Sequence, residues 1–177
     1  MAGRPVDEAR RDELLDAVVG YALAHGLGAM TWRPVALALG VSTTSLVHRF
    51  GSKEGMVQAV QARLRERILV ETSAEAPGEV VELTRRVWAR VSHPSRAQEF
   101  RLFFEVYGQA LADPARFEEF LGHVVADPLQ SFGADATGTL VLAALRGLVL
   151  DLLATGDRAR VDAAAAELLR RLGSPSG

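Results

Sequence analysis

The apolar residues of this chain recur with the period of an α-helix almost throughout, and this pattern constrains the fold more than any other feature. Between residues 7 and 24, one stripe of such a helix consists of Leu14, Leu15, Val18, Val19, Ala22 and Leu23. The alternation of apolar and polar residues that marks a half-buried β-strand never runs beyond a few positions. The sequence therefore predicts an all-α fold.

Capping residues and glycines divide this pattern into about nine helices. Their expected ranges are residues 7–24, 31–39, 42–50, 53–70, 79–91, 95–112, 113–126, 136–155 and 157–172. Thr31 and Ser42 are placed to act as N-caps, and Gly26 and Gly40 are placed to end the helices before them. The stretch 72–78, which is rich in small residues, is the best candidate for a junction between two parts of the chain.

Further helix boundaries are predicted from local patterns in the second half of the chain. Residues 95–98 have the spacing of a capping box, and Asp113-Pro114 is typical of an N-cap followed by the first helical residue. Asp127-Pro128 is expected to interrupt a helix, because proline lacks the N–H that a helix interior needs.

The spacing of Ala36, Gly40 and Leu46 indicates a helix-turn-helix. Two helices that cross steeply through a short turn need a small residue where they approach, which Ala36 supplies, and Gly40 permits the positive φ of the corner. Leu46 is expected on the inner face of the second helix, together with Val41 and Phe50. The other face of this helix is then left for a partner.

This outer face is rich in side chains that form hydrogen bonds. The residues expected to contact DNA on it or beside it are Thr31, Ser42, Thr43, Thr44, Ser45, His48, Arg49 and Lys53. Thr31, Thr43 and Lys53 are assigned to phosphates. Arg49 is the only long cation on the helix, and its guanidinium is able either to contact guanine O6 and N7 or to hold a phosphate. The sequence leaves both roles open.

The segment resembles the DNA-binding domain of the TetR family of transcriptional regulators over roughly the first third of the chain. The residues that carry the resemblance are His25-Gly26, Met30-Thr31, Val35-Ala36, Leu39-Gly40-Val41-Ser42, Phe50 and Lys53-Glu54. The resemblance implies a DNA-binding domain at residues 1–52 and a ligand-binding and dimerisation domain at residues 53–177, with the helix at 53–70 as the connector.

The same resemblance implies a homodimer, most simply a repressor, that binds palindromic double-stranded operator DNA and is released by a small-molecule effector. Dimer contacts are expected through the helices at about 136–155 and 157–172. The small residues that permit close approach there are Gly138, Ala143, Ala144, Gly147 and Ala163 to Ala166. The family commonly has a tyrosine where this chain has Val47, so an alternative stays open: a TetR-like module that binds a ligand or partner but has lost sequence-specific DNA binding.

Most of the aromatic residues lie between residues 87 and 132. They either fill the core among several helices or line a mostly apolar cavity, and the sequence leaves the two interpretations open. The candidate effector contacts are Trp88, Phe100, Phe103, Phe104, Tyr107, Phe120, His123 and Arg146. Arg146 lies in the otherwise apolar run 140–150, so its charge needs a carboxylate partner, a path to water or an anionic ligand, and the partner is favoured.

Residue types and motifs exclude several other classes of protein. The chain has no cysteine, which excludes disulfides, thiolate metal sites and cysteine nucleophiles. His93 and His123 lack a second ligand at metal spacing, so they are expected at helix ends or on the surface, and no metal or cofactor is expected. The sequence has no phosphate loop, zinc helix motif or nucleophile elbow, which argues against an enzyme.

The distribution of charge along the chain limits how it can bind DNA, and the lengths of its apolar runs indicate whether it can cross a membrane. Residues 1–67 carry nine Lys or Arg against seven Asp or Glu, and the remainder is acidic, so phosphate contacts must come from a local patch. Arg146 and Asp151 interrupt the longest apolar stretch, 136–154, whose uncharged runs are shorter than the ~20 residues that a membrane span needs. With no secretory signal at the N-terminus, the expected location is the cytoplasm.

Overall fold

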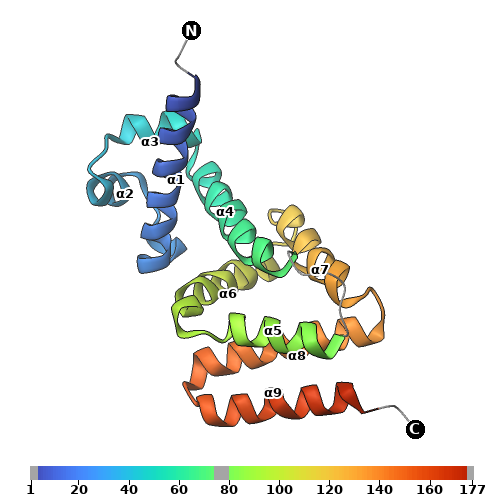
Figure 1. The fold of residues 1–177 in the computed structure, drawn as a ribbon. Helices are drawn as coiled ribbons and strands as arrows, with labels where there is room; N and C mark the ends of the chain where they lie inside the picture. Colours follow the sequence, from blue (N-terminus) through green and yellow to red (C-terminus); the bar gives the residue numbers. More distant parts are fainter. Residues whose placement is uncertain (1–3, 74–79, 175–177) are drawn as a thin grey trace.

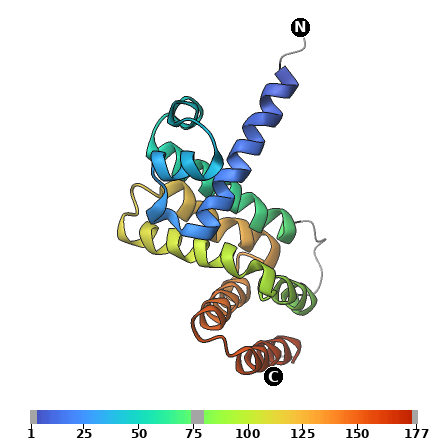
Figure 2. The same cartoon turned by 90° about the vertical axis from the view of Figure 1, so that its left-hand side faces the viewer.

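The computed structural model describes residues 4–73 and 80–174, and every regular element in these ranges is helical (Figures 1 and 2). The α-helices are α1 (Arg4–His25), α2 (Trp32–Leu39), α3 (Thr43–Phe50), α4 (Lys53–Ser73), α5 (Val80–Val91), α6 (Ala97–Ala112), α7 (Glu118–Phe132), α8 (Ala136–Thr155) and α9 (Arg158–Gly173). Two short 3-10 helices, η1 (Leu27–Ala29) and η2 (Pro94–Arg96), lie between them. The predicted all-α fold with about nine helices is confirmed for the described residues.

The N-terminal helices surround a first hydrophobic core. Val18 of α1, Leu46 of α3 and Met56 of α4 are fully buried in it. Helix α6 contributes Leu102 and Val106 to the same core, although it lies far from these helices in the sequence. Helix α6 therefore ties the N-terminal helices to the rest of the chain.

A second hydrophobic core lies among helices α5 to α9, and Val141 and Val161 are fully buried in it. Helices α8 and α9 lie side by side at the end of the molecule opposite α2 and α3 (Figures 1 and 2). Among the described helices, α8 alone is long and apolar enough to cross a membrane by length and composition. In the structure one side of α8 packs against α7 and α9.

The predicted capping box at residues 95–98 is wrong. Ser95 lies in η2, where its N–H donates to Nδ1 of His93 over 3.3 Å, and α6 begins only at Ala97. The hydroxyl of Ser95 also lies 2.7 Å from the same imidazole nitrogen. These local hydrogen bonds compete with a helical start, because they satisfy the polar groups of the turn without a helix.

The helix predicted to start at Asp113-Pro114 begins later, at Glu118. The residues between form a turn, in which the Asp113 carboxylate accepts from the N–H of Arg116 over 3.4 Å. The turn places the Phe117 ring in the first core, where only 6% of the residue is exposed. Burial of this ring favours the turn over an earlier helical start.

Helix α7 runs through Pro128, which contradicts the predicted interruption. Proline at this position leaves the carbonyl of Val124 without its helical donor. Nη2 of Arg146 on α8 hydrogen-bonds to this carbonyl and replaces the missing donor. The helix therefore continues to Phe132, and Gly133, with a φ of +95°, follows its end.

Two further differences concern helix ends. Gly26 has a φ of +77° but a ψ of 168°, so it leads into η1 in an extended conformation and is not the left-handed cap that was predicted. Helix α4 reaches Ser73 rather than ending near residue 70. Most of the junction predicted at residues 72–78 lies outside the described residues.

Candidate DNA-binding surface and effector cavity

The turn between α2 and α3 has the geometry of a helix-turn-helix corner. Gly40 is left-handed, with a φ of 66° and a ψ of 29°, and the N–H of Val41 donates to the Ala36 carbonyl over 3.0 Å. A Cβ on Gly40 would meet no atom within 4 Å, so the backbone conformation alone selects glycine there. Ala36 is buried, as expected for a small residue at the place where two helices approach each other.

One cap and one core residue fix the orientation of α3. The hydroxyl of Ser42 accepts from the N–H of Ser45 over 3.0 Å, as predicted for an N-cap. Leu46 is fully buried in the first core, and Val41 and Phe50 pack against that core partly buried. These contacts determine which side of α3 faces solvent.

The solvent-facing side of α3 carries most of the predicted DNA contacts. The exposed residues on it or beside it are Thr31, Ser42, Thr43, Thr44, Ser45, His48 and Lys53. We refer to these residues, together with Arg49, as the α3 surface. Helix α3 lies towards the end of the molecule opposite α8 and α9 (Figures 1 and 2).

Arg49 is half-buried, unlike the rest of the α3 surface. Its Cζ lies 5.5 Å from the centroid of the Phe50 ring, and its Nε is buried with no hydrogen-bond partner among the described residues. This cation–π contact holds the guanidinium near the C-terminal end of α3. Recognition helices contact base edges mainly with their N-terminal residues, so the position of Arg49 suits a phosphate better than a base.

Two apolar side chains are exposed in the same part of the molecule. Val47 is 43% exposed and Leu37 of α2 is 85% exposed. Leu37 belongs to no predicted site, and its one sequence signal is that it falls outside the apolar stripe of Val35 and Leu39. Exposed apolar atoms of this kind suit contacts with thymine methyl groups.

A cavity of about 100 Å³ lies among helices α4 to α8. Four of the predicted effector residues line it, namely Phe100, Phe103, Phe104 and Arg146. Most of the remaining wall is aliphatic, with Val87, Val91, Leu145 and Val149 among the lining residues. Arg146 is the single charged side chain among the described residues that line this cavity.

Three predicted effector residues lie outside this cavity in the surrounding core. Trp88 is buried in the second core, and its Nε1 donates to the Asp162 carboxylate over 3.2 Å. Tyr107 and Phe120 each pack with their ring centroids 5.9 Å from that of Phe103. None of the three lines this cavity, although Phe120 borders a smaller hollow beside it.

His123, the remaining predicted effector residue, borders a smaller hollow of about 40 Å³ that also touches Phe103 and Val124. Its Nδ1 lies 3.1 Å from the Asp127 carboxylate, and this carboxylate also lies 4.0 Å from Nε of Arg65. The walls of the two hollows share four residues, namely Ile68, Phe103, Val124 and Pro128.

Arg146 has no carboxylate within ion-pair distance among the described residues, which corrects the predicted carboxylate partner. Its guanidinium donates to the Val124 carbonyl, and its Cζ lies 5.8 Å from the centroid of the Tyr107 ring. Burial lowers the pKa of the Arg146 guanidinium from its ordinary value, and the interaction with Tyr107 opposes this shift. The cavity wall thus contains a partly desolvated cation that has no anionic partner in the described part of the chain.

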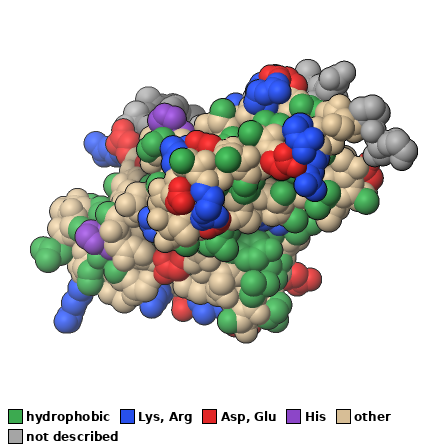
Figure 3. Space-filling view, turned by 90° about the horizontal axis from the view of Figure 1, so that it is seen from below, with side chains coloured by type: hydrophobic (Ala, Val, Ile, Leu, Met, Phe, Trp, Pro, Cys, Tyr) green, Lys and Arg blue, Asp and Glu red, His purple; other side chains and the backbone are tan. Residues whose placement is uncertain are grey.

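At the other end of the molecule, α8 exposes a row of apolar and small residues spaced three and four apart. The row consists of Leu140, Ala143, Gly147, Leu150 and Ala154, and α9 exposes Ala159, Ala163 and Ala166. Leu140 and Leu150 are 61% and 50% exposed. The view from this end shows hydrophobic side chains gathered among charged ones (Figure 3). We refer to this row on α8 and α9 as the α8–α9 surface.

Ala165, which is predicted among the small residues of the dimer contacts, is buried in the second core and lies outside the α8–α9 surface. Gly138, also predicted there, is not part of this surface. It is buried, and a Cβ there would collide with the carbonyl of Gly133. Its lack of a side chain therefore allows the chain to turn closely into α8. The Asp135 carboxylate caps this helix by accepting from the N–H of Gly138 over 2.8 Å.

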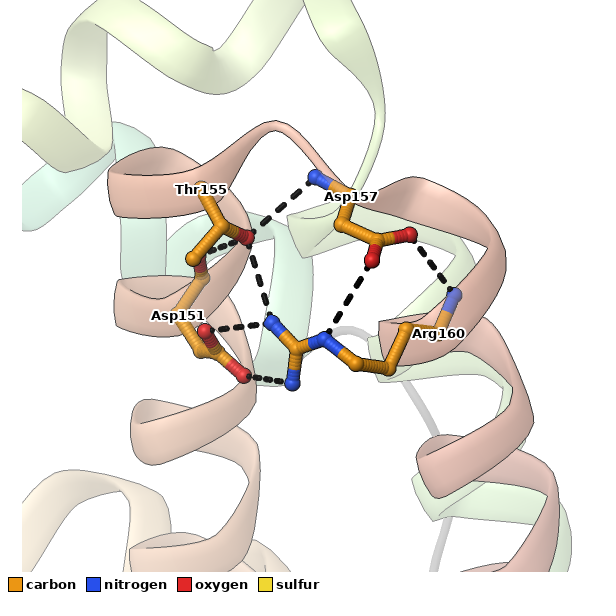
Figure 4. Close-up of polar contacts among 4 residues, drawn as sticks. All are labelled: Asp151, Thr155, Asp157 and Arg160. Atoms are coloured by element: carbon orange, nitrogen blue, oxygen red, sulfur yellow. Dashed lines mark hydrogen bonds and ion pairs between the residues drawn. The ribbon is translucent and has the colours of Figure 1, made fainter.

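The corner between α8 and α9 is held by a polar network (Figure 4). Arg160 donates to both carboxylate oxygens of Asp151, over 2.7 and 2.8 Å, and to Oγ1 of Thr155 over 3.2 Å. Its Nε also lies 3.4 Å from the Asp157 carboxylate. The hydrogen bonds from Arg160 lower the pKa of Asp151, and the same contacts raise the pKa of Arg160.

No group of three or more His, Asp or Glu side chains in the described part of the chain could hold a metal ion. His93 caps η2 and His123 contacts Asp127, so both histidines have structural partners. His25 is the last residue of α1, and its ring centroid lies 4.4 Å from that of Tyr21.

Known proteins share both the N-terminal domain and the fold. Residues 14–60 match the family model described as bacterial regulatory proteins, tetR family. The HTH-type transcriptional regulator AlkX of Mycobacterium tuberculosis is 28% identical over 136 residues, which cover 77% of this chain and 59% of AlkX. The chain thus spans less than two thirds of the length of this relative.

Solved structures share the fold along nearly the whole chain. A transcriptional regulator from Rhodococcus sp. Rha1 has a TM-score of 0.73 at 20% identity, covering 92% of this chain and 94% of that protein. The multidrug binding protein EbrR in complex with imidazole has a TM-score of 0.72 at 22% identity, covering 96% and 93%. GusR of Salmonella enterica has a TM-score of 0.71 at 22% identity, covering 97% and 96%. The chain thus has an N-terminal segment that matches the tetR family of bacterial regulatory proteins, and it shares its overall fold with these solved structures.

Proposed function

We propose that the protein is a transcriptional regulator that binds operator DNA through the α3 surface. The observation that carries this proposal is a fully buried Leu46 on α3 with exposed hydroxyl groups clustered at the N-terminal end of the same helix. Hydroxyl, imidazole and ammonium groups next to helix N-termini suit hydrogen bonds to base edges and phosphates. The α3 surface also projects away from the C-terminal helices (Figure 1).

The active form in this proposal is a homodimer formed through the α8–α9 surface. Exposed leucines such as Leu140 and Leu150 lose contact with water when two copies pair, and the alanines and Gly147 beside them let helices approach closely. A twofold dimer presents two α3 surfaces to successive major grooves about 34 Å apart. The operator is then a near-palindrome.

The effector in this proposal is a small molecule that enters the cavity and releases the DNA, which makes the protein a repressor. Ile68 of α4 lines the cavity, and α4 begins at Lys53 beside α3, so one helix touches both sites. A ligand that binds better when α4 is shifted lowers DNA affinity by its differential affinity for the two states. EbrR, which has a similar fold, is described in complex with imidazole and with proflavin. The proposed location is the cytoplasm, and no enzymatic step is proposed.

A salt-dependent gel shift with the DNA upstream of the protein's own gene tests the DNA-binding part. We expect a shift that resists competitor DNA, and Lys53→Ala should reduce the slope of log affinity against log salt by about one. Arg85→Ala is the matched control, because Arg85 is exposed on α5 and pairs with Glu82 away from the α3 surface. No competition-resistant shift with any upstream fragment would contradict the proposal.

One observation favours a second candidate, a ligand-binding module without sequence-specific DNA binding. The only long cation of α3, Arg49, is half-buried against Phe50, and Val47 occupies the position of the family tyrosine. This candidate predicts ligand binding in the cavity together with DNA binding that is weak and equal for all sequences. The same gel shift therefore separates the two candidates.

A further inference from the structure

We propose that the cavity binds a small molecule with an apolar body and one anionic head, a short aliphatic or monoaromatic carboxylate, and that Arg146 holds the head. The inference rests on the proposed function only in taking this cavity as the effector site. It is carried by the size of the cavity, by the charge in its wall and by the hydrogen bonding of Arg146.

The size of the cavity limits the body of the ligand. A dry apolar cavity of about 150 Å³ is enough to hold benzene. This cavity has about 100 Å³, and the adjoining hollow beyond Phe103 adds about 40 Å³. A single ring or a chain of a few carbon atoms therefore suits this space better than a multi-ring compound does.

The charge in the wall selects the head. Arg146 is the one charged group among the described residues that line the cavity, and no carboxylate of the described residues neutralises it. The nearby carboxylate of Asp127 is already shared between His123 and Arg65, at 3.1 and 4.0 Å. A cationic ligand would meet an uncompensated positive charge, and a neutral one would leave it uncompensated. A carboxylate supplies the missing charge and accepts strong hydrogen bonds.

The contact between Arg146 and Val124 has a structural cause, which must be separated from ligand binding. Pro128 cannot donate to the Val124 carbonyl, and one N–H of Arg146 does so instead. A guanidinium has several further N–H groups, and these remain for a carboxylate in the cavity. If the role of Arg146 is only structural, replacing Arg146 should have no effect once residue 128 supplies its own N–H to Val124. If Arg146 binds the ligand, replacing it should still weaken ligand binding.

The experiment uses this difference. The full chain is titrated by calorimetry with hexanoate, 1-hexanol and hexylamine, and then with benzoate and benzyl alcohol. Pro128→Ala restores the helical donor to Val124, and Arg146→Met is made in this background so that α7 keeps its hydrogen bonds. Arg101→Met is the matched control, because Arg101 also donates to a backbone carbonyl, that of Leu153 over 3.3 Å, but is exposed outside the cavity.

We expect at least one carboxylate to bind the unmodified chain and Pro128→Ala at least tenfold more tightly than its alcohol, with hexylamine the weakest. The Arg146→Met, Pro128→Ala double variant should bind the alcohol with unchanged affinity, which would show that the variant is folded. It should lose the preference for the carboxylate. Arg101→Met should keep the preference. Three outcomes would overturn the inference. The unmodified chain binds carboxylate and alcohol equally, it binds none of these compounds, or the preference for the carboxylate survives in the double variant.

The gel shift distinguishes this inference from the proposed function. If a carboxylate binds in an Arg146-dependent manner but leaves operator affinity unchanged, the proposed release of DNA is wrong and the ligand assignment stands. If carboxylates do not bind but another compound releases the DNA, the ligand assignment is wrong and the proposed function stands.

Discussion

The carboxylate of Glu105 on α6 accepts the N–H of Leu27 through both oxygens, at 3.0 and 3.1 Å. This contact joins the turn after α1 to the helix that lines the cavity through Phe104. The approach is close, because a Cβ on Gly26 would lie 3.1 Å from Oε2 of Glu105. A movement of α6 on ligand binding would therefore act directly on the N-terminal helices.

Glu105→Ala should lower the free energy of unfolding by about 1 to 3 kcal/mol, because it removes a charge-assisted hydrogen bond in a partly buried place. It should also reduce the effect of a bound effector on DNA affinity. Urea denaturation measures the first effect, and gel shifts with and without effector measure the second. Gln109→Ala, an exposed change one turn further along α6, is the control. Equal stability of the two variants would contradict this role of Glu105.

Gly40→Ala should destabilise the protein by about 1 to 2 kcal/mol, because an L-residue is strained in the left-handed region. The space around Gly40 is empty, so the effect comes from the backbone alone. Gly20 is the matched control: it lies inside α1, and a Cβ added there would also meet no atom within 4 Å. Gly20→Ala should stabilise by about 0.5 to 1 kcal/mol, since alanine favours a helix interior. Thermal unfolding of both variants tests this expectation, because the unfolding temperature should fall for Gly40→Ala and rise for Gly20→Ala.

Arg49→Ala should weaken the binding of all DNA sequences evenly and reduce the slope of log affinity against log salt by about one. The reason is the position of Arg49 near the C-terminal end of α3, over the ring of Phe50, where it suits a phosphate. Binding measured on the operator and on single-base variants of it checks this expectation. If the variant instead loses its preference at one base pair, Arg49 contacts that base.

The corner between α2 and α3 could be predicted from the sequence because its causes are local. Gly40 provides a backbone conformation, Ala36 provides space, and Ser42 provides a cap for the helix that begins at the next residue. Each of these effects acts within a few residues, so the spacing alone carries the information. Seven of the eight predicted DNA contacts are exposed for the same reason.

The features that could not be predicted depend on partners far away in the sequence. Helix α7 passes Pro128 only because Arg146 on another helix supplies a donor to Val124. Similarly, nothing in the spacing of α6 indicates that Glu105 caps a turn near the N-terminus. The sequence shows that aromatic residues concentrate between residues 87 and 132. Which of their rings line the cavity, however, depends on how each helix is rotated about its axis when the helices pack. Phe103 therefore lines it, whereas Trp88 does not.

Arg160→Gln should raise the pKa of Asp151 towards its ordinary value of about 4, because it removes the two hydrogen bonds that lower it. A lowered pKa in the folded state stabilises the fold above the ordinary value, and this contribution is lost as the pH falls through the lowered one. Carboxyl chemical shifts of Asp151 measured by NMR against pH test this expectation. Arg170→Gln is the control: Arg170 and Arg171 lower the pKa of Glu167 to about 2, so this variant should leave Asp151 unchanged.

Leu150→Asp should convert the proposed dimer into a monomer. Leu150 lies in the middle of the α8–α9 surface and is 50% exposed in a single chain, so pairing two copies there would place two carboxylates in an apolar contact. Sedimentation velocity measures the loss of the dimer, and operator affinity should fall with it, because one α3 surface cannot contact both half-sites. Leu111→Asp is the matched control, since Leu111 is 63% exposed on α6 outside this surface. A Leu150→Asp variant that stays dimeric, or a Leu111→Asp variant that becomes monomeric, would show that the subunits pair through another face.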